Sequence, residues 1–174
     1  MRSLIFLTLY LIFAYLGTDV CAQAREDIFT IYLVRHSEKD LDFNNYSDPP
    51  LAQCGQQRAE HLSSFLEDVN LKAIYSTDYI RTKTTAMPTV TSKNLKINNY
   101  NPKKLKEFSE FLKNRKENAL VVGHSNTTAV LAGLLVDKTL EEFDSGIYDR
   151  IYQVVICNDK GRLHLLHMPL DCQD

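Results

Sequence analysis

The sequence predicts a three-layer α/β sandwich, in which helices flank a mainly parallel central sheet. Short apolar runs, rich in β-branched and aromatic residues, alternate along the chain with longer segments whose apolar residues recur at helical spacing. The chain shows no internal repeat, so the alternation is typical of successive strands and helices in one layered domain. Ligands of such folds bind beyond the carboxyl ends of the strands.

Four strands, four helices and a closing hairpin are expected, in that alternating order. The short apolar runs predict strands at 28–34, 72–75, 96–100 and 119–122. Helical spacing of the apolar residues predicts helices at 55–69, 79–91, 102–115 and 127–136. Two further apolar runs around a polar turn predict a terminal hairpin of strands at 151–157 and 162–168.

The first residues are typical of a secretory signal peptide. A basic start is followed by an uncharged apolar run at 4–16 and by small residues that allow cleavage near Ala22 or Ala24. The run is shorter than the roughly 20 residues of a membrane span. We therefore expect a signal peptide at 1–22, a single domain at 25–174, and an exported protein, periplasmic or secreted, without stable membrane insertion. An uncleaved N-terminal anchor is the alternative.

Composition narrows the possible partners. The formal net charge is −2, and no long basic run is present, so nothing indicates binding to nucleic acid. Removal of Cys21 with the signal peptide leaves Cys54, Cys157 and Cys172. Export allows one disulfide among these three, but the sequence does not determine which pair closes. Their spacing fits no zinc pattern, and no metal or cofactor is expected.

Three predicted strands end in polar clusters that contain two histidines and two arginines. Arg35 and His36 follow the first strand, Arg81 lies shortly after the second, and His124 follows the strand at 119–122. Arginine binds two phosphate oxygens at once, and a neutral imidazole can attack phosphorus. A second histidine can stabilise the charge that builds up in the transition state. The set therefore predicts phosphoryl transfer.

These clusters resemble the motifs of the histidine phosphatase superfamily, the phosphoglycerate-mutase-like enzymes. The matching blocks are LVRHSEK at 33–39, STDYIRTKTTA at 76–86 and VVGHSNT at 121–127. The resemblance implies a phosphohistidine at His36 and a phosphate pocket lined by Arg35, Arg81 and His124. It also makes Ser37 and Asn126 candidate phosphate-binding residues, through backbone or side-chain donors.

The sequence departs from the larger members of that family after the third strand. Those members usually carry a glutamate general acid there, within an insertion, whereas residues 98–102 contain no carboxylate. The short segment implies a small or absent lid. Glu38 is the nearest candidate acid in the sequence, with Asp149 second and Glu107 weaker; a good leaving group would need no acid.

The expected function is metal-independent hydrolysis of phosphate monoesters by a compact, exported histidine phosphatase with a small phosphorylated substrate. One alternative is a module of the same fold that binds a phosphorylated ligand without turnover, which the missing acid favours. A phosphoglycerate-type mutase is a further alternative, although export and the short segment disfavour it. The sequence leaves the natural substrate and the oligomeric state open.

Overall fold

A computed structural model describes residues 27–45 and 47–171 of the chain. Its centre is a six-stranded sheet with the order β3-β2-β4-β1-β5-β6. Four neighbouring strands run parallel: β3 (Ile97–Asn99), β2 (Ala73–Ser76), β4 (Ala119–Gly123) and β1 (Ile28–Arg35). The predicted hairpin, β5 (Arg150–Cys157) and β6 (Lys160–His167), is added antiparallel to β1. The sheet is thus mainly parallel, as predicted.

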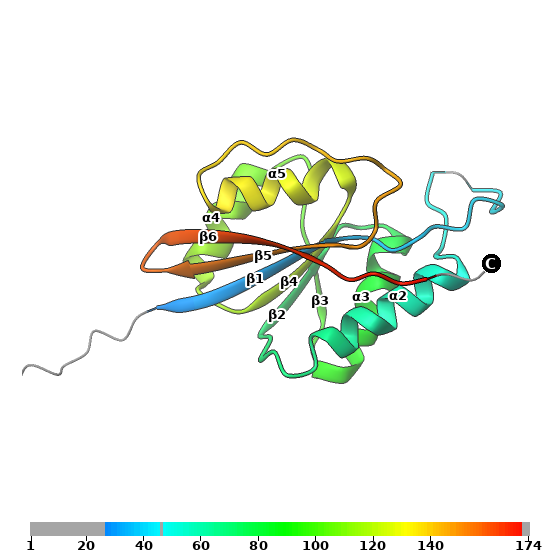
Figure 1. Cartoon of the computed structure of the whole chain (residues 1–174), viewed down its shortest axis with the longest axis horizontal. Helices are drawn as coiled ribbons and strands as arrows, with labels where there is room; N and C mark the ends of the chain where they lie inside the picture. Colours follow the sequence, from blue (N-terminus) through cyan, green and yellow to red (C-terminus); the bar gives the residue numbers. More distant parts are fainter. Residues whose placement is uncertain (1–26, 46, 172–174) are drawn as a thin grey trace, which may run out of the picture.

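Helices cover both faces of the sheet and complete three layers (Figure 1). α2 (Gln53–Phe65) and α3 (Ile80–Lys93) lie on one face, and α4 (Leu105–Arg115) and α5 (Ser125–Leu135) lie on the other. Alternate strand residues point to opposite faces, which divides the apolar core in two. Leu33 and Val121 pack on the side of α4 and α5, whereas Val34 and Val122 pack on the side of α2 and α3.

All four helices begin within three residues of the predicted starts, and side-chain hydrogen bonds explain the shift at two of them. α4 begins at Leu105 because the side chain of Asn101 accepts the backbone N–H of Lys103 at 2.9 Å, which keeps this segment in a turn. α5 begins at Ser125, earlier than predicted, because the Thr127 hydroxyl accepts the backbone N–H of His124 at 2.9 Å. Side-chain hydrogen bonds set both helix starts.

The predicted signal peptide, together with Cys21 and Cys172, lies outside the described residues. Within the part of the chain that is described, no helix has the length and apolar character to cross a membrane. Cys54 is disulfide-bonded, and Cys157 has a free thiol.

Candidate active site

His36 lies where β1 ends, at the carboxyl edge of the parallel strands. Its backbone N–H donates to the carbonyl oxygen of Gly123 at 2.9 Å, which ties the end of β1 to the end of β4. The ring Nδ1 lies 2.8 Å from the carbonyl oxygen of Ser37. Because a carbonyl oxygen only accepts, Nδ1 must carry the proton, and the lone pair of a neutral ring is then on Nε2.

Burial keeps His36 neutral. Only 4% of the residue is exposed, and burial lowers the pKa of its imidazole to about 3. The hydrogen bond to Ser37 opposes this shift, while the nearby charges of Arg35 and Arg81 and the ring of His124 lower the pKa further. At neutral pH, His36 is therefore an uncharged imidazole with a free lone pair, the form that a nucleophile requires.

His124 lies opposite His36, directly before α5. The two ring centroids are 5.4 Å apart. The Nε2 atom of His124 lies 3.0 Å from the hydroxyl of Thr77. The Thr82 hydroxyl donates to backbone carbonyls, so Thr77 donates its own hydroxyl hydrogen to Thr82, at 3.0 Å. The Thr77 oxygen is then left to accept from His124, which places the proton of the neutral ring on Nε2.

The ring of His124 is also uncharged at neutral pH. Burial lowers its pKa to about 4, and the positive charges of Arg81 and Arg35 act in the same direction. A bound phosphate dianion would reverse this balance, because an anion beside the ring favours its protonated form. The second histidine is thus able to gain a proton when phosphate arrives.

Two arginines supply the fixed positive charge. Arg35 is 6% exposed and contacts the loop at 145–148. Arg81 lies in the first turn of α3, 3.2 Å from a carboxylate oxygen of Asp48. The same carboxylate accepts the backbone N–H of Ile80 at 3.0 Å, so Asp48 holds both the start of α3 and its arginine. The ring of Tyr79 lies 4.4 Å from the Arg81 guanidinium.

Two glycines let the surrounding backbone come close. A Cβ at Gly123 would lie 2.6 Å from the Tyr100 hydroxyl and 2.8 Å from Thr127 Oγ1, so a larger residue would displace the start of α5. A Cβ at Gly55 would lie 2.2 Å from the carbonyl oxygen of Glu38. The absent side chain therefore allows α2 to pack against the segment that follows His36.

A cavity of about 550 Å³ opens between the two histidines and the start of α4, within the size range of small-molecule sites. Its lining combines the two imidazoles and two cations with hydroxyl, amide and aromatic side chains, and includes no carboxylate. The lining residues are His36, Tyr79, Arg81, Pro102, Lys103, His124, Ser125, Asn126 and Thr127. Elsewhere in the described residues, no group of three or more His, Cys, Asp or Glu side chains is arranged to hold a metal.

A family model agrees with this arrangement. The model of the histidine phosphatase superfamily, branch 1, matches residues 31–111, which include Arg35, His36 and Arg81. Solved structures of a protein histidine phosphatase and of a phosphoglycerate mutase share the overall fold. The chain belongs to the histidine phosphatase superfamily. No curated protein sequence matches it.

Solved structures whose names give different activities resemble the chain in fold. The protein histidine phosphatase SixA, solved with tungstate, gives a TM-score of 0.67 at 16% identity, over 80% of this chain and 97% of that chain. The α-ribazole phosphatase of Shigella flexneri gives a TM-score of 0.66 at 14% identity, over 84% of this chain and 100% of that chain. A phosphoglycerate mutase from Bacillus anthracis gives a TM-score of 0.58 at 16% identity, over 81% of this chain and 93% of that chain. The TM-scores show a common fold, and identities this low leave the substrate open.

The candidate site brings together most of the residues predicted from the sequence. His36, Arg81, His124 and Asn126 line the cavity, and Arg35 is buried beside them. Ser37 is 2% exposed, is absent from the lining, and donates its backbone N–H to Thr85 Oγ1 at 2.9 Å. Its position indicates that it holds the segment after β1 against α3, rather than offering its side chain to a ligand.

Glu38, the candidate general acid, contacts Arg58 instead of the cavity. Its carboxylate accepts three hydrogen bonds from Arg58, at 2.7, 2.9 and 3.0 Å, and does not line the cavity. Arg58 is buried, because its side chain is only 8% exposed. A carboxylate that neutralises a buried guanidinium in this geometry is a structural anchor for α2. The prediction of Glu38 as the acid is therefore not favoured by its contacts.

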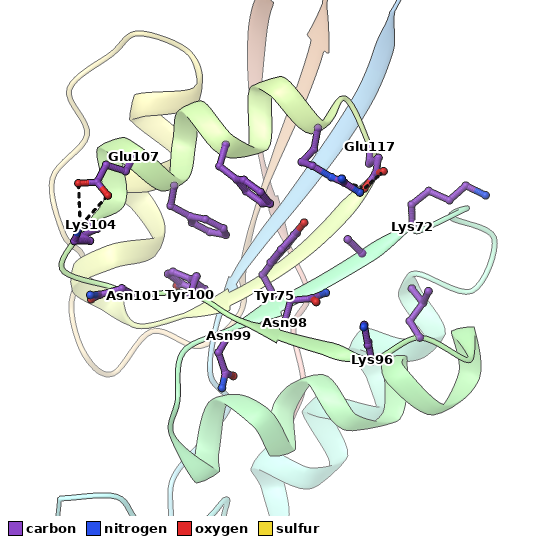
Figure 2. A pocket seen from close by; sticks show the side chains of 15 residues that line it. Lys72, Tyr75, Lys96, Asn98, Asn99, Tyr100, Asn101, Lys104, Glu107 and Glu117 are labelled. Carbon is purple, nitrogen blue, oxygen red and sulfur yellow. Dashed lines mark hydrogen bonds and ion pairs between the residues drawn. The ribbon is translucent and has the colours of Figure 1, made fainter.

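The two other carboxylates also point elsewhere. Asp149 lies 2.8 Å from Nδ1 of His167 on the hairpin, a contact that lowers the pKa of its carboxyl group. Glu107 pairs with Lys104 at 3.0 Å (Figure 2). This pair lines a separate groove of about 750 Å³ between α4 and the β2–β3 edge, which contains none of the predicted phosphate-binding residues. No candidate acid from the sequence reaches the cavity.

Several contributors to the site were not predicted. Thr77 orients His124, Tyr148 covers Arg35, and Lys103 lines the cavity. Thr77 falls in the block at 76–86 and Lys103 in the helix predicted at 102–115, and neither was given a role. These contacts form only where segments distant in the sequence come together in the fold. The position of Thr77, two residues after the predicted strand at 72–75, was the one signal available.

Proposed function

We propose that this protein is a metal-independent phosphatase that hydrolyses phosphate monoesters through a phosphohistidine at His36. The observation that carries the proposal is the hydrogen bond from His36 Nδ1 to the Ser37 carbonyl, inside a cavity lined by cations. It leaves Nε2 as a fixed nucleophile with its lone pair free.

The proposed reaction proceeds in two displacements. The Nε2 lone pair of His36 forms a bond to phosphorus while the bond from phosphorus to the ester oxygen breaks. Arg35 and Arg81 neutralise the non-bridging oxygens, and His124 stabilises them as charge builds up. The leaving oxygen takes a proton from solvent or from the site. Water then attacks the phosphohistidine, which releases inorganic phosphate and restores the neutral ring.

The cavity lining favours substrates whose leaving group needs little protonation. None of its lining side chains is a carboxylate, and the three candidate acids are engaged elsewhere. A general acid contributes typically 10²–10⁴-fold to such reactions, so its absence penalises alkyl esters most. We therefore infer that aryl phosphates or similarly activated phosphoryl groups turn over fastest.

A series of phenyl phosphates with graded leaving-group acidity tests this proposal. Inorganic phosphate release should rise steeply with the acidity of the phenol and should vanish in His36→Ala. The alternative function, binding without turnover, is favoured by the same lack of a carboxylate. It predicts measurable affinity for these esters but no phosphate release from any of them, including the most activated. Isomerised phosphoglycerate in a parallel assay would instead support a mutase.

We further propose that the protein is exported. Support comes from the basic and apolar N-terminal sequence and from the disulfide at Cys54, a bond that persists in oxidising compartments. N-terminal sequencing of the protein from fractionated cells tests this. Cleavage near Ala22 or Ala24 in the exported fraction is expected. An intact N-terminus in the cytosolic fraction would contradict it.

A further inference from the structure

Arg35 is held by one short loop, residues 145–148, which leads into β5. Its Nη1 donates to the carbonyl oxygen of Ser145 and, at 3.1 Å, to that of Ile147. The Tyr148 hydroxyl lies 3.4 Å from Nη2, and the Tyr148 ring centroid lies 4.1 Å from the guanidinium carbon. The loop therefore contacts both the edge and the face of the guanidinium.

These contacts select which donors of Arg35 remain for a ligand. A guanidinium carries five N–H donors in a rigid plane. The two carbonyls take both hydrogens of Nη1, which removes the end-on pair formed by the two terminal nitrogens. The Tyr148 hydroxyl accepts one hydrogen of Nη2 at 3.4 Å, which leaves Nε–H and the other hydrogen of Nη2, a side-on pair, for a ligand. Nε is buried, and no described residue accepts its hydrogen. A side-on pair of this kind binds two oxygens of one phosphate.

Tyr148 also contacts the nucleophile. Its ring centroid lies 6.2 Å from that of His36, with the planes tilted by 60°. The ring therefore lies beside both the imidazole that would carry the phosphoryl group and the arginine that would hold it. An aromatic face over a guanidinium attracts its charge and excludes water from that side.

We propose that Tyr148 is a positioning residue, whose ring holds Arg35 so that its Nε–Nη2 edge faces the phosphate seated at His36. The inference rests on the proposed function only in that phosphate binds at this site, and it does not require turnover. It assigns the loop at 145–148 a part in phosphate binding.

The segment just before the loop provides a matched control. Phe143, a few residues earlier, lies over the guanidinium of Arg150 at 5.3 Å, in the same kind of contact but with a different arginine. Removing either ring loosens loop packing, but only the ring of Tyr148 lies over Arg35. Comparison of the two variants therefore separates the loss of Arg35 positioning from a general loosening of the loop.

Titration with inorganic phosphate, followed by NMR, tests the proposal without any need for catalysis. Tyr148→Ala should weaken phosphate binding roughly five- to tenfold, the range that a cation–π contact supplies. Tyr148→Phe, which keeps the ring, should restore most of that loss, and Phe143→Ala should bind phosphate as the wild type does. Equal weakening in Phe143→Ala and Tyr148→Ala, or no weakening in Tyr148→Ala, would overturn the proposal.

A double-mutant cycle tests whether Tyr148 acts through Arg35. In an Arg35→Gln background, Tyr148→Ala should change phosphate affinity less than about twofold. The same five- to tenfold loss in that background would show that Tyr148 acts independently of the guanidinium, and would refute the positioning role. Wild-type protein that binds phosphate with this pattern but releases none from esters would leave the inference standing and reject the phosphatase proposal.

Discussion

The ring of His36 meets the ring of His124 edge-on, with centroids 5.4 Å apart and planes at 68°. Two imidazoles this close, buried beside two arginines, cannot both be charged without a large penalty. Both are accordingly neutral in the unliganded site. One neutral ring can serve as the nucleophile, and the other can take a proton once a phosphate dianion lies between the arginines.

The hydroxyl of Thr77 is expected to matter for catalysis through His124. Thr77→Val keeps the side-chain shape but leaves the Nε2–H of His124 without its partner. We expect kcat/KM for an aryl phosphate to fall about tenfold, because an unmade buried hydrogen bond costs about 1–3 kcal/mol. Thr77→Ser, which keeps the hydroxyl, should stay close to wild type. Equal activity of Thr77→Val and wild type would show that the hydroxyl does not orient the ring.

Glu38 is expected to contribute to stability rather than to proton transfer. Glu38→Gln leaves Arg58 buried without its full counter-charge, so urea unfolding should show a loss of about 2–4 kcal/mol. The kcat of the folded variant, measured at low temperature, should fall less than about fivefold, since the carboxylate does not reach the cavity. A hundredfold loss of kcat with unchanged stability would restore Glu38 as the acid.

Stability should depend on pH through His36. Its pKa is about 3 in the folded protein and about 6.5 in an unfolded chain. Between these values the unfolded chain binds a proton that the folded protein does not, so stability falls as pH falls. At pH 5 the loss from His36 alone is about 2 kcal/mol relative to neutral pH.

Urea unfolding at pH 7.5 and pH 5 measures this loss. His36→Gln should lose about 2 kcal/mol less than wild type over the same interval, because it has no imidazole to protonate. His61→Gln, a change on the exposed side of α2, should behave as wild type. If His36→Gln and wild type lose the same stability, the ring is not held neutral in the folded protein.

Local sequence patterns predicted most of the fold. Apolar runs located all six strands, and the polar clusters directly after them located His36, Arg81 and His124, because parallel strands bring their carboxyl ends to one edge. The helix starts near 102 and 127 were wrong by a few residues. There, the side chains of Asn101 and Thr127 decide between turn and helix.

The partners of the site residues were not predictable from local patterns. Glu38 meets Arg58, and Tyr148 meets Arg35 across more than a hundred residues of sequence, contacts that only the packed sheet and loops create. A carboxylate close to the nucleophile in sequence was therefore named as a candidate acid, although its observed contacts are with a buried arginine. Proximity in the chain is a poor guide where the backbone turns sharply after a strand.

The most direct test of the proposed mechanism is to trap the phosphoryl group. The protein is incubated with an aryl phosphate, quenched in alkali, which preserves phosphohistidine, and digested for mass spectrometry. We predict an added phosphoryl group on the peptide that contains His36, and none in His36→Ala. A folded wild-type protein that carries no phosphoryl group on this peptide while it releases phosphate would contradict covalent catalysis by His36.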